Sequence, residues 1–138
     1  FGFIGEYVYA EQLSGPKKGY TLPFAPPAST IFNVKYQKPY FKFVNNAYLS
    51  LDYKLTAAQN NIVPPEVATD GYQVFNFSLG GELLIQNQKI AIGMQAQNLL
   101  NRKYFTQTIY HRLINVPVAS RNFIINISIP FVGNLKHN

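Results

Sequence analysis

Residues that could perform chemistry are few in this chain, and their spacing predicts no catalytic or metal-binding site. The two histidines, His111 and His137, have no partner at the spacing of metal ligands. The six acidic residues form no close pair suited to general acid–base catalysis. Cysteine is absent, which excludes disulfides and thiolate chemistry. We therefore expect neither an enzyme nor a bound cofactor.

Aromatic and basic side chains could instead contact a ligand without transforming it. They occur in two of the three long segments that separate the expected strands, 13–29 and 99–120, and are absent from the remaining one, 56–71. Packing within a loop is the alternative role for each of them, because long loops commonly pack their own side chains. The candidate ligand contacts are Tyr20, Phe24, Tyr104, Phe105, Tyr110, His111 and Arg112.

The composition is unusual for a soluble domain. Of the 138 residues, 47% are hydrophobic and only 13% are charged, whereas a typical soluble domain has about 25% charged residues. The net charge of +6 comes mainly from the scarcity of acidic residues, 6 against 12 Lys and Arg. The basic residues are scattered and form no run, so a nucleic-acid partner is not expected. No stretch approaches 18 consecutive apolar residues, which excludes a transmembrane helix.

Alternating hydrophobicity predicts an all-β fold, an antiparallel meander of about six amphipathic strands. We expect the strands at about 1–12, 30–37, 40–55, 72–86, 89–98 and 121–131, with tight turns at 37–39 and 86–88. The stretch "NFIINISIPF" (122–131) shows the alternation most clearly. Its apolar row is Phe123, Ile125, Ile127, Ile129 and Phe131.

Two environments could require this alternation. A half-buried soluble strand directs its apolar row inward, whereas a transmembrane barrel strand directs it toward lipid. The polar rows favour the barrel, because they contain small residues and amides such as Ser50, Gly80, Gln95 and Asn126 rather than Lys and Glu. Long and short connections also alternate strictly, which places all long loops at one end, as in outer-membrane barrels.

Aromatic residues near the ends of the expected strands agree with two interfacial girdles of such a barrel. Good strand propensity is the alternative explanation for Tyr and Phe. The girdle toward the short turns would contain Tyr36, Tyr40, Phe41 and Phe131, and the girdle toward the long loops Tyr53, Tyr72, Phe75 and Phe123.

Three phrases resemble the late strands of TonB-dependent outer-membrane receptors. "MQAQNLLNRKYF" (94–105) is similar to the family's penultimate strand and the loop that follows it. "INVPVASRNFIINISIPF" (114–131) resembles its closing strand, and "GYTLPFAPPASTIFNVKYQ" (19–37) resembles an earlier entry into a strand. In "NLLN", Asn98 and Asn101 also suit turn geometry on chemical grounds.

The resemblance implies that 1–131 forms the last part of a 22-stranded transmembrane β-barrel in the bacterial outer membrane. Residues 132–138 would be a short C-terminal tail, although the family normally stops at the aromatic that Phe131 represents. The implied partners are the rest of the barrel, a plug domain, the TonB complex acting through the plug, and outer-membrane lipid. The implied function is uptake of a scarce small nutrient of the siderophore–iron, cobalamin or glycan class.

Two other functions remain open on the sequence alone. A soluble lipocalin-like barrel would line a ligand pocket with its apolar rows, and an outer-membrane barrel could serve adhesion or structure. The isolated chain would also have two unpaired edge strands, and such edges tend to pair with another chain. We expect it to self-associate through 1–11 and 121–131 or to close into a small irregular barrel.

Overall fold

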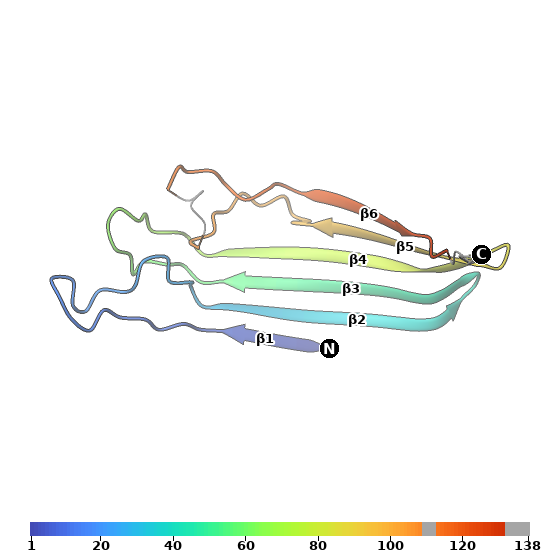
Figure 1. The fold of residues 1–138 in the computed structure, drawn as a ribbon, viewed down its shortest axis with the longest axis horizontal. Helices are drawn as coiled ribbons and strands as arrows, with labels where there is room; N and C mark the ends of the chain where they lie inside the picture. Colours follow the sequence, from blue (N-terminus) through green and yellow to red (C-terminus); the bar gives the residue numbers. More distant parts are fainter. Residues whose placement is uncertain (109–112, 132–138) are drawn as a thin grey trace, which may run out of the picture.

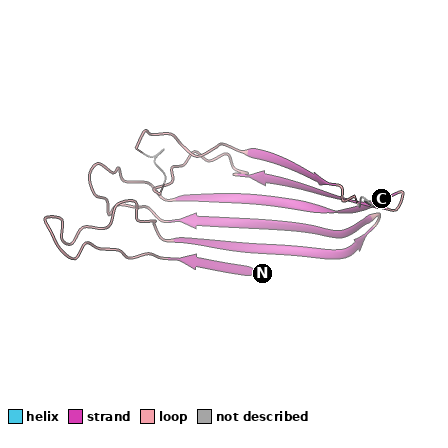
Figure 2. Cartoon of the chain, in the orientation of Figure 1, coloured by secondary structure: helices cyan, strands magenta, loops and turns pink. Residues whose placement is uncertain are grey.

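The computed structural model describes residues 1–108 and 113–131, which form a single antiparallel sheet (Figure 1; Figure 2). Within these ranges there is no helix with the length and apolar character needed to cross a membrane. The strands are β1 (Gly2–Glu6), β2 (Ser29–Phe41), β3 (Val44–Thr56), β4 (Tyr72–Ile85), β5 (Gln88–Gln97) and β6 (Asn122–Ser128). The predicted all-β meander of six antiparallel strands is confirmed.

The strands lie in the sheet in chain order, from β1 to β6. In the described part of the chain, β1 pairs only with β2 and β6 only with β5. The sheet is therefore open, and the expected closure into a small barrel is not the arrangement found. Both edges stay available for pairing, so self-association remains a prediction.

Long loops and short turns occupy opposite ends of the sheet, as the alternation of connection lengths predicts (Figure 1). We call these the loop end and the turn end. The first loop (7–28), the second loop (57–71) and the third loop (98–121) share the loop end. At the turn end, Gln86 and Asn87 join β4 to β5 with φ of 49° and 67°, the left-handed geometry of a two-residue hairpin turn.

The expected turn at 37–39 is wrong, because β2 continues to Phe41 and the turn lies at Lys42 and Phe43. Pro39 suggested a turn, since it has no N–H to donate. The pairing of β2 with β3 continues on both sides of Pro39. Lys38 pairs with Ala47 and Tyr40 with Asn45, while Pro39 itself has no paired partner. A proline at an unpaired position costs the sheet no hydrogen bond.

Two strands are shorter than expected. β1 ends at Glu6, and 7–12 enter the first loop instead of continuing the strand to residue 12. β6 ends at Ser128, so Ile129 and Phe131 follow the strand instead of belonging to it, as was expected of them as members of a lipid-facing row. Pro130 explains the second end, because it lacks a ladder donor. Its carbonyl accepts a hydrogen bond of 3.2 Å from Gln88 Nε2.

The pairing register joins the alternating rows of the strands into two continuous faces. One cross-strand row contains Val34, Leu51, Phe77, Ala96 and Phe123. Together with its neighbours at two-residue spacing this forms the apolar face. Its further members include Phe3, Phe32, Tyr36, Leu49, Tyr53, Phe75, Leu79, Leu83, Ile92, Met94, Ile125 and Ile127.

The opposite side of the sheet is the polar face. Its members include Asn33, Ser50, Asp52, Asn76, Ser78, Gly80, Gly93, Gln95 and Asn126. Asn33 Nδ2 donates to Ser50 Oγ at 2.9 Å and to Asp52 Oδ1 at 2.6 Å. The Asn33 amide therefore links β2 to two polar side chains of β3 on this face.

No described residue covers the central part of the apolar face. Ile125 and Ile127 are each 64% exposed, and Leu49 and Met94 are nearly half exposed. The buried apolar side chains outside this face, Val63, Tyr72 and Val74, lie at the loop end. The core of the described chain is thus a cluster beneath the loops.

Aromatic rings form a row on the apolar face near the loop end. The ring centroids of Phe3 and Phe32 are 5.0 Å apart, those of Phe32 and Tyr53 6.2 Å, and those of Tyr53 and Phe75 4.6 Å. This row contains two residues expected in a girdle at that end, Tyr53 and Phe75. The prediction that Tyr72 belongs to this girdle is wrong, because Tyr72 pairs with Thr56 on the polar face and is buried there.

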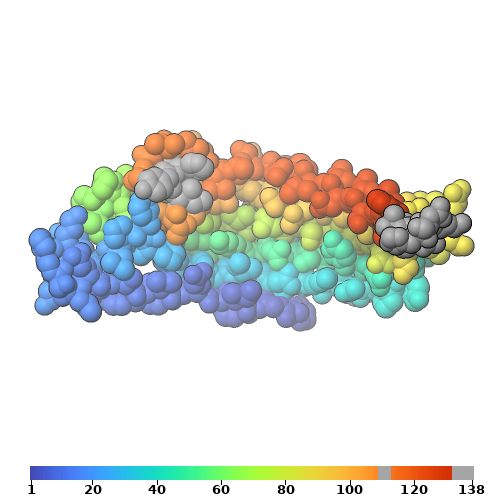
Figure 3. Space-filling view, viewed as in Figure 1, coloured from blue at the N-terminus to red at the C-terminus, as the bar shows by residue number. Residues whose placement is uncertain are grey.

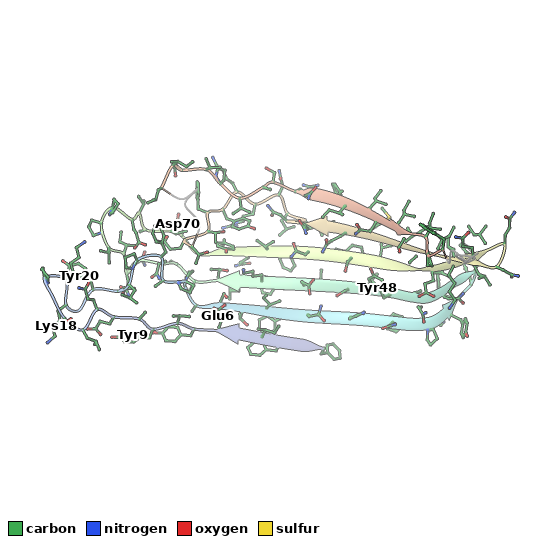
Figure 4. The ribbon with its side chains drawn as sticks, viewed as in Figure 1. Glu6, Tyr9, Lys18, Tyr20, Tyr48 and Asp70 are labelled. Carbon is green, nitrogen blue, oxygen red and sulfur yellow. The ribbon has the colours of Figure 1, made fainter. Side chains whose placement is uncertain are left out.

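Tyr48 lies across two glycines on the polar face, close to the turn end (Figure 4). A Cβ built on Gly80 would lie 2.8 Å from the Tyr48 ring, and one built on Gly93 would lie 3.4 Å from its hydroxyl oxygen. Lys35 Nζ stands 5.1 Å from the centroid of the same ring. An aromatic ring that covers strand glycines restores packing they cannot supply.

Candidate binding surface at the loop end

The three loops gather at one end of the molecule, where the first, second and third loops appear as blue, green and orange atoms in Figure 3. Hydrogen bonds link them in sequence. Gln59 Nε2 of the second loop donates to the Ala25 carbonyl of the first at 2.9 Å. The Thr69 hydroxyl of the second loop donates to the Gln107 side chain of the third. The loop end is therefore a connected structure.

The first loop folds back on itself as a small hairpin. Gln12 N–H donates to the Tyr20 carbonyl and Gly19 N–H to the Gln12 carbonyl, each at 2.9 Å. Gly15 and Gly19 both have a φ of 85°, a left-handed geometry that glycine adopts at little cost. This hairpin positions Tyr20 at its far end, where the side chain is 48% exposed.

Glu66 fastens the first loop to the second. Its carboxylate accepts the Phe24 N–H and, at 3.0 Å, the Val63 N–H. A carboxylate that accepts backbone N–H groups makes stronger hydrogen bonds than a neutral acceptor. Phe24 has a φ of 58°, and the bond from its N–H to Glu66 holds that left-handed backbone in place.

Asn98 and Asn101 organise the base of the third loop. Asn98 Nδ2 donates to the Arg102 carbonyl and Asn98 Oδ1 accepts the Arg102 N–H, both at 2.8 Å. Asn101 Oδ1 accepts the Arg121 N–H at 2.9 Å, immediately before β6. Both asparagines are left-handed, with φ of 49° and 54°, so the prediction of turn geometry for this pair is confirmed. The phrase "NLLN" thereby connects the end of β5 to the start of β6.

Buried side chains join the third loop to the sheet and to the second loop. The Tyr104 ring stacks on Tyr72 of β4 with a centroid distance of 4.2 Å. Thr69 and Gln107 are 4% and 3% exposed. Burial raises the pKa of the Tyr104 phenol, and the charge of an ionised Tyr72 would raise it further. The third loop thus packs on the polar face, since Tyr72 belongs to that face.

A hollow of about 360 Å³ lies between the first-loop hairpin and the second loop. Tyr9, Glu11, Tyr20, Asn60 and Asn61 line part of it. The Tyr9 hydroxyl donates to Glu11 Oε2, and this bond, together with the carboxylate charge, raises the pKa of Tyr9. Two phenol rings, a carboxylate and two amides could bind a polar ligand through hydrogen bonds and ring contacts.

The structure separates the predicted ligand contacts. Tyr20 lines the hollow (Figure 4), whereas Tyr104 is occupied by its stack on Tyr72. Phe24 and Phe105 are half-buried at other places in the loops. The predictions for Tyr110, His111 and Arg112 lie outside the described residues, as does the tail 132–138.

Of the residues that line this hollow, sequence reasoning named only Tyr20 and missed the polar groups of Tyr9, Glu11, Asn60 and Asn61 among others. Tyr9 and Glu11 were expected inside the first strand, and the asparagine pair carried no pattern beyond loop composition. The hollow depends on how two loops meet, which no local signal specifies. In the described ranges, no three His, Cys, Asp or Glu side chains are grouped so that they could hold a metal ion.

Comparison with known proteins gives no relative of this chain. No family model matches it, and neither does any curated protein or solved structure.

Proposed function

We propose that this chain is the C-terminal part of a TonB-dependent receptor barrel in the bacterial outer membrane, and that it takes part in uptake of a scarce small nutrient. One observation carries the proposal. The apolar face extends over all six strands and is open in the described residues, while the other face carries amides, hydroxyls and glycines. In water such a face is a liability, because monomeric soluble proteins rarely expose large apolar patches.

The lengths of the four inner strands support the same proposal, whereas the edge strands β1 and β6 are shorter, with 5 and 7 residues. Crossing the hydrocarbon layer takes about 9 to 11 tilted residues. β2 and β3 have 13 residues each, β4 has 14 and β5 has 10. The aromatic row from Phe3 to Phe75 lies on the apolar face near the loop end, where a barrel of this kind would carry an aromatic girdle at the membrane interface.

The two ends of the sheet also agree with an outer-membrane orientation. In these barrels the long loops are extracellular and the short turns periplasmic. The loop end, with its hollow beside Tyr20, would then face the source of the nutrient. The third loop packs on the polar face through Tyr104, which in a closed barrel is the face toward the lumen.

The resemblance to TonB-dependent receptors supplies the rest of the proposal. Two of its phrases meet in space, because Asn101 of "NLLNRKYF" binds the backbone of Arg121 in "SRNF". The nutrient would enter past a plug domain that the TonB complex moves. The rest of the barrel would pair with the free edges of β1 and β6, and no cofactor would be required.

A soluble lipocalin-like module is the second candidate. It needs the apolar face to line a closed pocket. The open sheet and the exposed isoleucines of β6 argue against it. The loops that could close over a pocket pack at the polar face instead, as the stack of Tyr104 on Tyr72 illustrates.

A matched pair of cysteine variants tests which face meets lipid. Ile124 and Ile125 are adjacent isoleucines of β6 that belong to opposite faces, and the chain has no cysteine of its own. In vesicle-inserted protein we expect the Ile124→Cys thiol to react with a water-soluble maleimide. The Ile125→Cys thiol should be protected, and a fluorophore attached to it before insertion should be quenched by lipids brominated on their acyl chains.

Failure of this test is readily recognised. A lipocalin-like fold predicts a protected Ile125→Cys thiol without any quenching by brominated lipid, and that result would overturn the membrane assignment. The receptor part is tested by the coding sequence upstream of Phe1, which should encode a plug domain and a TonB box. An upstream sequence that encodes a different kind of domain would refute the receptor function but not the membrane barrel.

A further inference from the structure

The turn end of the apolar face contains a hollow that the proposed function does not use. Its volume is about 540 Å³, within the range of about 300 to 1,000 Å³ typical of small-molecule sites. Tyr36, Phe41, Leu49, Leu83 and Ile92 form much of its lining, and Lys38 contributes the one charged side chain. An apolar recess with a single cationic group is a distinct chemical environment on this face.

A break in the strand register creates the hollow. Between Asn45 and Tyr48 the pairing of β3 with β4 shifts by one residue, and Asn46 has a φ of 49°. This bulge places Ala47 against Gly81, where a Cβ on the glycine would lie 2.4 Å from Val44 Cγ1 and 3.3 Å from the Ala47 Cα. Val44 therefore fills the space directly above Gly81, and the recess lies beside it, where Ala47 and the glycines stand among large lining side chains.

Positive charge lies beside the hollow. Lys38 Nζ is 5.7 Å and Lys42 Nζ 5.9 Å from the centroid of the Phe41 ring. None of the residues that line the hollow is acidic. Glu82, which stands between two lining residues of β4, belongs to the polar face, where its backbone pairs with Asn45 and Ala91. The two ammonium groups are available to a ligand with a negative charge.

We propose that this hollow binds an anionic glycerophospholipid, with an acyl chain in the recess and the headgroup phosphate near Lys38 and Lys42. The inference rests on the proposed function, because it requires the apolar face to meet a bilayer. Apolar walls match an acyl chain, and lysines at the edge of a membrane-facing surface attract anionic headgroups. Long lysine side chains can extend from apolar surroundings to the headgroup level.

Native mass spectrometry of the chain released from detergent micelles tests the inference. The probes are phosphatidylglycerol and phosphatidylcholine with identical acyl chains. We expect phosphatidylglycerol to be retained preferentially. Lys38→Gln with Lys42→Gln should weaken phosphatidylglycerol binding roughly tenfold or more, since each lysine near an anionic surface contributes about 1 kcal/mol, or about fivefold. Binding of phosphatidylcholine should stay unchanged.

A second variant addresses the recess. Ala47→Leu should fill it and weaken the binding of both lipids. The controls are Lys17→Gln with Lys18→Gln, which remove two charges from the first loop, and Ala91→Leu, which adds the same volume to the polar face. Neither control should change lipid retention. Because Lys38 and Lys42 are exposed, their substitution keeps the test valid if Ala47→Leu prevents folding.

Three results would overturn the inference. Equal retention of both lipids, unaffected by the lysine variant, would indicate ordinary annular lipid. Complete competition by inorganic phosphate would indicate an anion site without an acyl chain. A dimer that Ala47→Leu dissociates would place a second copy in the hollow. If the Ile125→Cys variant also shows no lipid contact, the proposed function itself fails; if that contact is present, only this inference does.

Discussion

At the loop end of this protein the side chains bury one another, whereas along the strand body they do not. Val74 and Tyr72 are 4% and 6% exposed beneath the third loop. In the middle of the same strand, Leu79 is 38% exposed on the apolar face. In β4, Tyr72, Val74 and Leu79 all pair with β3 in one unbroken register, so backbone pairing with β3 does not account for the difference.

The two regions differ in whether other parts of the chain cover their side chains. The loop end supplies its own cover, because Glu66, Asn98 and Gln107 bind groups on other segments of the chain. The strand body has hydrogen-bonded backbone but an apolar face with no cover among the described residues. Its stability therefore depends on the medium, and in lipid the exposed rows cost nothing. The comparison predicts that the two regions respond to different perturbations.

The largest expected effect is the one that depends on the medium. Leu79→Lys places a charge on the apolar face of the central strand β4, and Ser78→Lys places the same charge one residue earlier on the polar face. In vesicles we expect Leu79→Lys to lower the free energy of unfolding by about 2–4 kcal/mol, the cost of lysine near the bilayer midplane. Ser78→Lys should cost far less. Urea unfolding of vesicle-inserted protein measures both, and equal costs would show that the two faces do not differ in environment.

At the loop end, Asn98→Gly should have the next largest effect. Glycine keeps the left-handed backbone of Asn98, whose φ is 49°, but it removes the side-chain bonds to Arg102 and Ala119. Because Asn98 is only 3% exposed and its bonds are partly buried, we expect a loss of about 2–3 kcal/mol. Hydrogen exchange of the Arg102 amide should report this loss in detergent and in vesicles alike.

The control for this variant is Asn87→Gly at the turn end. Asn87 is also left-handed, with a φ of 67°, and is exposed. The same substitution should change stability there by less than about 0.5 kcal/mol. If Asn98→Gly were equally mild, the loop end would owe its order to something other than this asparagine.

The sequence is sufficient to predict the strand body, because the alternation that selects strands also assigns their faces. The row from Phe123 to Ile127 and its neighbours in β4 and β5 are correctly placed on one face. The prediction of a turn at 37–39 was wrong for a reason that is not local. Pro39 is tolerated inside β2 because it occupies a position that makes no pair with β3. Strand propensity alone does not tell an unpaired position from the end of a strand.

The loop end was far less predictable, since its contacts join segments distant in sequence. The turn geometry of Asn98 and Asn101 followed from residue type, but their bonds to Ala119 and Arg121 did not. Tyr72 was expected among the outward-facing aromatics, yet it lies on the polar face beneath Tyr104. A one-residue difference in register moves a side chain to the opposite face. Because β4 has aromatic residues at both even and odd positions, its sequence alone does not determine which of them face outward.

A smaller effect tests packing on the polar face of the strand body. In Gly80→Ala the new Cβ would lie 2.6 Å from the Ile92 carbonyl oxygen, which is backbone, and 2.8 Å from the Tyr48 ring. We expect a loss of about 1–3 kcal/mol from this overpacking. Gly93→Ala is the matched control, because its Cβ meets only the Tyr48 hydroxyl oxygen, at 3.4 Å. Equal unfolding midpoints in urea would refute the close approach of Tyr48 to β4.

The smallest effect concerns alkaline pH and is restricted to the loop end. Burial raises the pKa of Tyr104 above its ordinary value of 10.0, so the folded state favours the neutral phenol. Its contribution to stability is therefore complete below pH 10 and is lost as the pH rises through the higher, folded pKa. Hydrogen exchange of the Val118 amide, which donates to the Tyr104 carbonyl, should accelerate over this interval beyond the ordinary base catalysis. Tyr104→Phe retains the ring stack without an ionisable group and should abolish the excess. An identical excess in Tyr104→Phe would assign the alkaline loosening to another group and remove this distinction between the two regions.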